Sequence, residues 1–297
     1  MYAAFKRFLQ VPRRIKGLYA TPESYLFFPP VLCNSIPKSG THLLLQILEV
    51  IPGISNYGTQ IMVPRAYKLN LELIYSTLLM RPKFSLKEET PQVYIRWIKQ
   101  IIPGEVVFAH LLYQPEFIEE LAKKNCIHYF IYRDPRDVVI SDVFFITFLS
   151  MNHTMHDYFA KTLNNMNERI SAGILGADDP KMKNNYPSIV EQFEIFRGWL
   201  ECNDVFAVKY EDLVSGHRNK ILQQMAAFYL KHSNSKLDID DLAQRMETNI
   251  NPNISRTFRK GEVGGWKQAF TQNHKDQMKE VAGKLLIDLG YEKDDQW

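Results

Sequence analysis

The chain has 297 residues, of which 45% are hydrophobic and 23% are charged, as in ordinary globular proteins. Its formal net charge is only +3 and its basic residues form no long run, which argues against a nucleic-acid partner. No segment reaches the roughly 18 to 20 consecutive apolar residues that cross a bilayer, so no membrane span is expected.

The N-terminal segment, residues 1–22, is basic and loosely amphipathic, and its first 20 residues contain no acid. It lacks the continuous apolar core of a secretory signal. We expect a helical extension that leads to the first strand, with a transit peptide or a membrane-surface helix as alternatives.

Strand-like and helix-like patterns then alternate along the chain. The strand-like runs are nearly continuous in apolar character, as expected for strands buried on both faces, and they cover residues 25–36, 105–112, 126–134 and 204–213. Helical periodicity covers residues 41–51, 115–124, 135–149, 187–201 and 219–232. This order predicts an α/β fold, one domain over residues 1–297 with a central, mainly parallel sheet flanked by helices. Ligands of such sheets bind at the carboxyl ends of the strands.

Three cysteines, Cys33, Cys126 and Cys202, stand far apart and include no C-x-x-C pair. An odd number without a framework spacing predicts buried thiols in a reducing compartment, and therefore a cytoplasmic protein. The polar stretch 173–188, rich in Gly, Pro, Asp and Asn, predicts a surface loop or lid.

The first motif is "IPKSGTHLL", residues 36–44, where the first strand gives way to a helix. A glycine-containing turn there leaves backbone N–H groups at the start of the helix, and Lys38 adds a full positive charge, which suits an anion. The order differs from the nucleotide-binding P-loop G-x-x-x-x-G-K-[ST], because the lysine precedes the glycine. A plain Ser/Gly/Thr turn that caps a helix is the alternative.

The second motif is "YRDPRDVVIS", residues 132–141, after the third strand-like run. Asp134 and Pro135 are typical of a helix N-cap followed by proline at the first helical position. Arg133 at the strand end and Ser141 two turns later suit an anion. The alternative is a salt bridge from Arg133 to Asp134 or Asp137.

The third motif is "RKGEVGGWK", residues 259–267. Two cations followed by Gly261 let side chains and backbone N–H groups converge on one anion. By itself such a segment is more often a solvated basic turn.

Taken together, the three motifs resemble the cytosolic-type sulfotransferases that use 3′-phosphoadenosine 5′-phosphosulfate (PAPS) and release adenosine 3′,5′-bisphosphate (PAP). "PKSGTHLL" resembles their P-loop-like 5′-phosphosulfate loop, "YRDPRDVVIS" their 3′-phosphate site, and "RKGEVGGWK" their C-terminal R-K-G-x-x-G-D-W-K segment. The motifs stand in family order from residue 36 to residue 267, so the resemblance covers most of the chain.

The resemblance implies which residues bind the donor. Its 5′-phosphosulfate would be held by Lys38, Ser39, Gly40, Thr41 and the backbone N–H of His42. Its 3′-phosphate would be held by Arg133, Ser141, Arg259, Lys260 and Gly261. Its adenine would contact Tyr210.

The resemblance also implies in-line transfer of a sulfuryl group to an acceptor hydroxyl or amine. The family's base is a histidine at a strand end followed by leucine, which is His110 in "FAHLL". With an ordinary pKa of about 6.5, His110 would suit a base at neutral pH. Lys38 would stabilise the charge on the leaving phosphate. No metal is expected, because the histidines form no H-E-x-x-H or similar ligand set.

Three positions and one motif depart from the family pattern. Leu43 stands where many members carry an adenine-stacking tryptophan, and Phe108 where animal members often have a catalytic lysine. Gly265 replaces the aspartate of G-D-W-K. The dimer motif K-x-x-x-T-V-x-x-x-E is matched only in part by residues 267–276, so the oligomeric state stays open.

The expected acceptor is a small molecule. The segments that line family pockets carry aromatic and apolar side chains, at Tyr57, Met62, Tyr67, Tyr113, Phe144, Phe145 and Phe148. Such a lining suits a phenol, a steroid or another alcohol. The same loops carry Asp178, Asp179 and Asn184, which would suit a polar or cationic acceptor.

Three other functions remain as alternatives. A P-loop-type kinase of a small molecule or nucleotide would need Walker order and Mg²⁺. A nucleotide-binding protein without catalysis would keep the anion loops but not require His110. A Golgi-type carbohydrate sulfotransferase would normally carry a membrane anchor.

Overall fold

The computed structural model describes residues 11–13, 15–62, 91–179, 185–251, 263–294 and 296–297. They fall into two compact units. The first takes its residues from Met1–Met62, Lys83–Tyr132 and Phe196–Phe258, and the second from Val63–Pro82, Arg133–Ile195 and Arg259–Trp297. The single domain over residues 1–297 stays a prediction. Of the predicted N-terminal extension, residues 1–10 and 14 lie outside the described residues.

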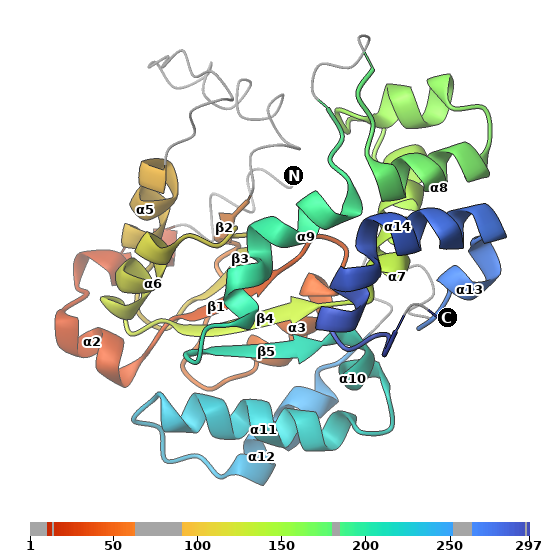
Figure 1. Cartoon of the computed structure of the whole chain (residues 1–297). Helices are drawn as coiled ribbons and strands as arrows, with labels where there is room; N and C mark the ends of the chain where they lie inside the picture. Colours follow the sequence, from red (N-terminus) through yellow and green to blue (C-terminus); the bar gives the residue numbers. More distant parts are fainter. Residues whose placement is uncertain (1–10, 14, 63–90, 180–184, 252–262, 295) are drawn as a thin grey trace, which may run out of the picture. The chain divides into compact units, whose positions relative to one another are not determined.

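The first unit contains a five-stranded parallel sheet in the order β2-β3-β1-β4-β5 (Figure 1). The strands are β1 Val31–Ser35, β2 Gln60–Ile61, β3 Val106–Ala109, β4 Ile127–Tyr132 and β5 Val205–Lys209. Four of them lie inside the predicted runs, and β1 and β4 are almost fully buried. The prediction of an α/β fold with a parallel sheet is confirmed.

Helices surround this sheet within the first unit. They are α2 Pro22–Phe27, α3 Thr41–Leu48, α5 Pro91–Lys99, α6 Pro115–Ala122, α10 Tyr210–Val214, α11 Arg218–Lys231 and α12 Ile239–Thr248. Helices α3, α11 and α12 bury apolar side chains against β1 and β4, in one core cluster that includes Leu44, Tyr129, Met225 and Met246. This packing fixes α3, and with it the loop that precedes α3, at the carboxyl end of β1.

The second unit is helical. Its described elements are α7 Pro135–Phe144, π-helices Phe145–Leu149 and Tyr158–Thr162, α8 Met166–Leu175, α13 Trp266–Ala269 and α14 Gln272–Asp288, together with most of α9 Ile189–Arg197. Asp134 accepts a hydrogen bond from the Arg136 N–H and so caps α7, with Pro135 at the first helical position, as predicted. Among the described helices of both units, none is long and apolar enough to cross a membrane.

The predicted surface loop at 173–188 is closed at its base. Ala177 and Tyr186 exchange two backbone hydrogen bonds of 2.8 Å, and the Tyr186 hydroxyl donates to Asp142 of α7 at 2.6 Å. The burial of Tyr186 therefore anchors both ends of the loop to the second unit.

His128 is a buried histidine of β4 whose two ring nitrogens have no hydrogen-bond partner among the described residues. Its ring packs edge-on against Trp199, and burial lowers its pKa to about 3. In the unfolded chain this histidine binds a proton near pH 6.5, whereas in the folded protein it stays neutral down to about pH 3. The unfolding free energy therefore keeps its full value above pH 6.5 and decreases as the pH falls toward 3. We expect His128→Leu to remove about 1.4 kcal/mol per pH unit from this slope in urea unfolding between pH 6 and 4. Equal slopes in the wild type and in His128→Leu would contradict the prediction.

Candidate functional site

The turn between β1 and α3 has a backbone shaped by left-handed residues. Lys38 has φ 68° and Gly40 has φ 102°, and the Ser39 N–H donates to the Ile36 carbonyl at 3.2 Å. Helix α3 then begins at Thr41, with Gly40 as its N-cap and no side-chain cap. The first N–H groups of α3 therefore lack a capping side chain and are available to a ligand.

Gly40 is required by its surroundings as well as by its φ angle. A Cβ at this position would lie 2.6 Å from Cδ2 of Tyr210 and 3.3 Å from Ile131. The buried ring of Tyr210 therefore backs the turn and holds it in place. Contact between Tyr210 and an adenine stays a prediction.

Ser39 carries the clearest sign of a missing partner. The residue is fully buried, and its Oγ has no hydrogen-bond partner within the described part of the chain. A buried hydroxyl is normally hydrogen-bonded, so an orphaned one next to the start of a helix fits an anion that accepts from it. The residues present thus suit a phosphate or sulfate group, and Lys38 supplies the charge.

His110 follows β3, and the structure brings it next to this turn. The backbone N–H of His110 donates to the Ile61 carbonyl at 2.8 Å. Its Nδ1 lies 3.1 Å from the carbonyl oxygen of Ser35 and 2.9 Å from the Ser35 hydroxyl. Because a carbonyl only accepts, the contact with the Ser35 carbonyl favours a proton on Nδ1, whereas the Ser35 hydroxyl can either donate to Nδ1 or accept from it. With the proton on Nδ1, the free electron pair of Nε2 can take a proton.

The pKa of His110 differs from the ordinary value expected from the sequence. The pKa is lowered to about 4, mainly by burial and to a smaller extent by the charges of His42 and Lys38, while the hydrogen bond to the Ser35 carbonyl raises it. The pKa of His42 is also lowered, by burial and by Lys38. His110 is therefore neutral throughout the physiological pH range.

Phe108 lies between the two histidine rings. Its ring centroid is 5.3 Å from that of His42 and 5.4 Å from that of His110. The side chain at the position of the family's lysine thus adds an apolar surface beside His110, and no cation. Leu43, at the family's tryptophan position, packs against the core cluster.

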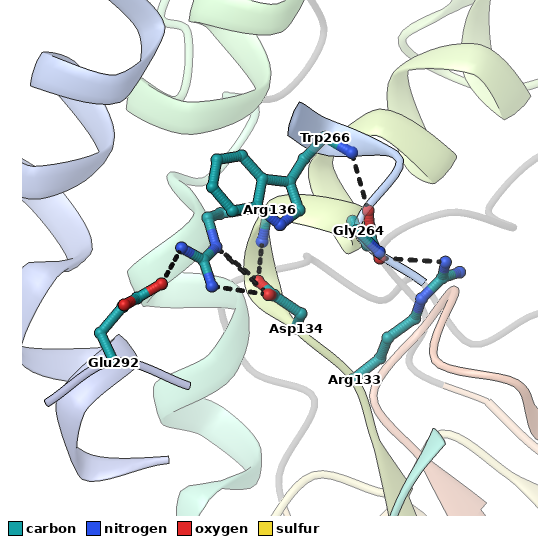
Figure 2. Close-up of polar contacts among 7 residues, drawn as sticks. Arg133, Asp134, Arg136, Gly264, Trp266 and Glu292 are labelled. Carbon is teal, nitrogen blue, oxygen red and sulfur yellow. Dashed lines mark hydrogen bonds and ion pairs between the residues drawn. The ribbon is translucent and has the colours of Figure 1, made fainter. Parts of the chain in front are cut away.

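In the second unit, the motif after β4 forms a compact ion-pair arrangement (Figure 2). Arg133 Nη2 lies 3.4 Å from Asp137 Oδ2, as one of the alternatives from the sequence proposed. Asp134 instead pairs with Arg136, whose Nε and Nη2 donate at 2.9 and 2.8 Å. Arg136 also contacts Glu292 and stacks against Trp266, with its guanidinium carbon 4.0 Å from the ring centroid. Ser141 lies on α7, partly buried.

Asp137 holds the turn in which Gly265 replaces the family's aspartate. Its two carboxylate oxygens accept from the N–H groups of Gly264 at 2.8 Å and Trp266 at 3.0 Å. The C-terminal motif is thereby tied to the segment that carries Arg133 (Figure 2). Arg259, Lys260 and Gly261 lie outside the described residues, as do Tyr67 and Asn184.

We expect Asp137→Asn to lower the unfolding free energy by about 1–3 kcal/mol. The amide keeps one acceptor oxygen, so one of the two backbone N–H groups would face an NH₂ group that cannot accept a hydrogen bond. Urea unfolding measures this change. The exposed Asp157, which pairs with Lys161 at 2.7 Å, provides a matched control, and Asp157→Asn should leave the unfolding free energy nearly unchanged. Equal losses in the two variants would refute a special role for Asp137.

The predicted site residues thus fall into three groups. Lys38 to His42, His110 and Tyr210 belong to the first unit, Arg133 and Ser141 belong to the second, and Arg259 to Gly261 are not described. Two contributors were not foreseen from the sequence, namely the Ser35 side chain and the Asp137 carboxylate as a backbone acceptor. Their partners lie 75 and up to 129 residues away in the chain, so no local pattern indicates them.

Comparison with known proteins supplies independent information. No curated protein sequence matches the chain significantly. Among solved structures, mouse sulfotransferase SULT7A1 complexed with PAP aligns with a TM-score of 0.54 and 16% identity, over 92% of this chain and 91% of that chain. Retinol dehydratase aligns in its complex with androsterone and the inactive cofactor PAP (TM-score 0.52, 15% identity, 87% and 81% coverage). It also aligns in its complex with retinol and PAP (TM-score 0.54, 15% identity, 93% and 86% coverage).

At these identities the structural matches establish the fold. The model of the sulfotransferase domain family matches residues 28–290, a span that includes the turn before α3, His110 and Arg133. With nearly the whole sequence matched and the same fold, the chain belongs to the sulfotransferase domain family.

Proposed function

We propose that this sulfotransferase moves the sulfuryl group of PAPS to a hydroxyl or amine of a small-molecule acceptor, with His110 as the base. The observation that carries the proposal is the placement of His110 against the turn before α3. There, buried Ser39 Oγ has no partner among the described residues, and His110 Nδ1 is 2.9 Å from Ser35 Oγ. A proton acceptor thus stands beside a site that suits an anion.

The 5′-phosphosulfate of the donor would lie in the turn before α3. Lys38, the Ser39 and Thr41 hydroxyls, and the backbone N–H groups of Gly40 and His42 would hold it. Arg133 and Ser141 would take the 3′-phosphate, with Arg259, Lys260 and Gly261 closing over it and Tyr210 contacting the adenine. Anchoring both ends of the donor would aim its sulfur at the acceptor, which is the main catalytic use of such binding.

In the proposed reaction, Nε2 of His110 takes the proton of the acceptor hydroxyl. The bond from the acceptor oxygen to sulfur forms while the bond from sulfur to the 5′-phosphate oxygen breaks. That electron pair remains on the phosphate oxygen, and Lys38 stabilises its charge. A pKa of about 4 makes His110 a weak base in the donor-free protein. A bound anion beside the ring favours the imidazolium form and raises its proton affinity.

The acceptor is proposed to be a small, largely apolar molecule. Androsterone and retinol occupy the two retinol dehydratase complexes, which share this fold. In this chain, the ring centroids of Phe144 and Phe148 lie 5.0 Å apart near the end of α7, and Phe148 is 48% exposed. Such rings suit the contact surface of a phenol or steroid. A cytoplasmic location, consistent with three free cysteines, is part of the same proposal.

The test is a transfer assay with PAPS and a panel of phenols, steroids, other alcohols and amines, run in EDTA and read by mass spectrometry. Sulfated product from at least one class, absent with His110→Ala, is the expected result. PAPS binding without transfer to any acceptor would favour a nucleotide-binding protein without catalysis. Transfer that requires added Mg²⁺ would contradict the metal-free mechanism.

A further inference from the structure

Three polar side chains form a continuous chain of contacts from the base to the start of α3. His110 Nδ1 is 2.9 Å from Ser35 Oγ, and Ser35 Oγ is 2.6 Å from Thr41 Oγ1. Ser35 is fully buried and Thr41 is 5% exposed. Both separations are those of hydrogen bonds, so each contact needs one hydrogen between its two atoms, from a hydroxyl or from Nδ1–H.

Each hydroxyl donates only one hydrogen, so the chain has a direction. If Thr41 donates to an anion before α3, its oxygen is left to accept from Ser35. Ser35 Oγ can then only accept from His110, so Nδ1 carries the proton and Nε2 is free. If Thr41 instead donates to Ser35, the Ser35 hydroxyl can donate to Nδ1, which places the ring proton on Nε2.

We propose that Ser35 is a positioning residue that sets the tautomer of His110 according to whether an anion occupies the turn before α3. With an anion bound, Nδ1–H donates to Ser35, Ser35 donates to Thr41 and Thr41 donates to the anion, which leaves Nε2 free to accept a proton. Without an anion, the Ser35 carbonyl, 3.1 Å from Nδ1, and the Ser35 hydroxyl compete for opposite tautomers. Nε2 of His110 is therefore free to accept a proton when the donor is bound. This inference rests on the proposed function.

The tautomer of His110 can be read directly. The ring nitrogens of ¹⁵N-histidine-labelled protein are observed by NMR with and without PAP, and a His110→Gln sample assigns the signal. We expect PAP to shift His110 to the Nδ1-protonated form in the wild type and in Ser35→Thr, which keeps a hydroxyl. In Ser35→Ala this response should be lost, because only the backbone carbonyl then contacts Nδ1.

Turnover provides the second readout. With an acceptor from the transfer assay, kcat of Ser35→Ala should fall about tenfold, because the imidazole then keeps only the carbonyl contact to orient it. PAP affinity should stay within about threefold, and Ser35→Thr should restore most of kcat. Cys33→Ala is the matched control, because Cys33 lies on the same strand and contacts the Thr41 carbonyl at 3.5 Å. This control should keep both the PAP response and kcat.

The outcomes separate this inference from the proposed function. If the wild type does not bind PAP, the proposed function fails at its first step. If PAP binds and His110→Ala is inactive, but Ser35→Ala keeps the PAP response and kcat of the wild type, only the role of Ser35 is refuted. A wild-type tautomer that PAP does not change would refute it as well.

Discussion

Replacing His110 with alanine is expected to lower kcat by about 10²- to 10⁴-fold, the usual contribution of one general base. PAP affinity should change by less than about threefold, because the ring contacts Ser35 through Nδ1 and, in the proposed mechanism, Nε2 would face the acceptor rather than the phosphates. Steady-state kinetics with the best acceptor, together with calorimetric PAP binding, measures the two quantities separately. The exposed His217→Ala controls for loss of a histidine and should behave as the wild type.

The pH profile adds a second check on His110. A base must be unprotonated, so activity is present above its pKa and is lost as the pH falls through that value. Since burial lowers the pKa of His110 to about 4, kcat/KM should stay level from pH 8 to about 5. An acid limb near pH 6.5 that disappears with His110→Gln would show that the base titrates as an ordinary histidine.

Gly40→Ala is expected to have the largest effect on donor binding. The new Cβ would lie 2.6 Å from the Tyr210 ring, at a φ of 102° that side chains rarely adopt, so the turn must move. We expect PAP affinity to fall at least about 100-fold and the unfolding free energy to fall by about 2–4 kcal/mol. Calorimetry and urea unfolding measure these losses.

Gly58→Ala is the matched control for this substitution. Gly58 also has a positive φ, 71°, but a Cβ there has no neighbour within 4 Å among the described residues. It should therefore show only the backbone cost of about 1–2 kcal/mol and keep PAP affinity. If Gly40→Ala bound PAP as tightly as Gly58→Ala, the turn before α3 would not be the donor site.

The sequence predicted much of the fold because its signals were local. Continuous apolar runs located four strands, and Asp134 followed by Pro135 located the start of α7 within one residue. Strand β2, Gln60–Ile61, was missed because two residues carry no periodicity. The predicted helix at 135–149 ends as a π-helix from Phe145, a change in backbone hydrogen bonding that no side-chain pattern indicates.

The candidate site was predicted less completely, for reasons of tertiary structure. The glycine turn and His110 could be named as candidates from the sequence, because the family motifs are short and ordered, and their roles stay predictions. The low pKa of His110 could not, because it arises from burial. The same is true of Asp137, whose oxygens accept from Gly264 and Trp266, more than 120 residues away.

The proposed mechanism requires that the turn before α3 binds the donor nucleotide. Isothermal titration calorimetry of PAP and of ATP in EDTA measures this binding, with Gly40→Ala as the variant that should lose it. We expect PAP to bind at least about 100-fold more tightly than ATP, and added Mg²⁺ to leave this order unchanged. ATP binding that equals or exceeds PAP binding, above all if it requires Mg²⁺, would refute the proposed donor site and favour a kinase.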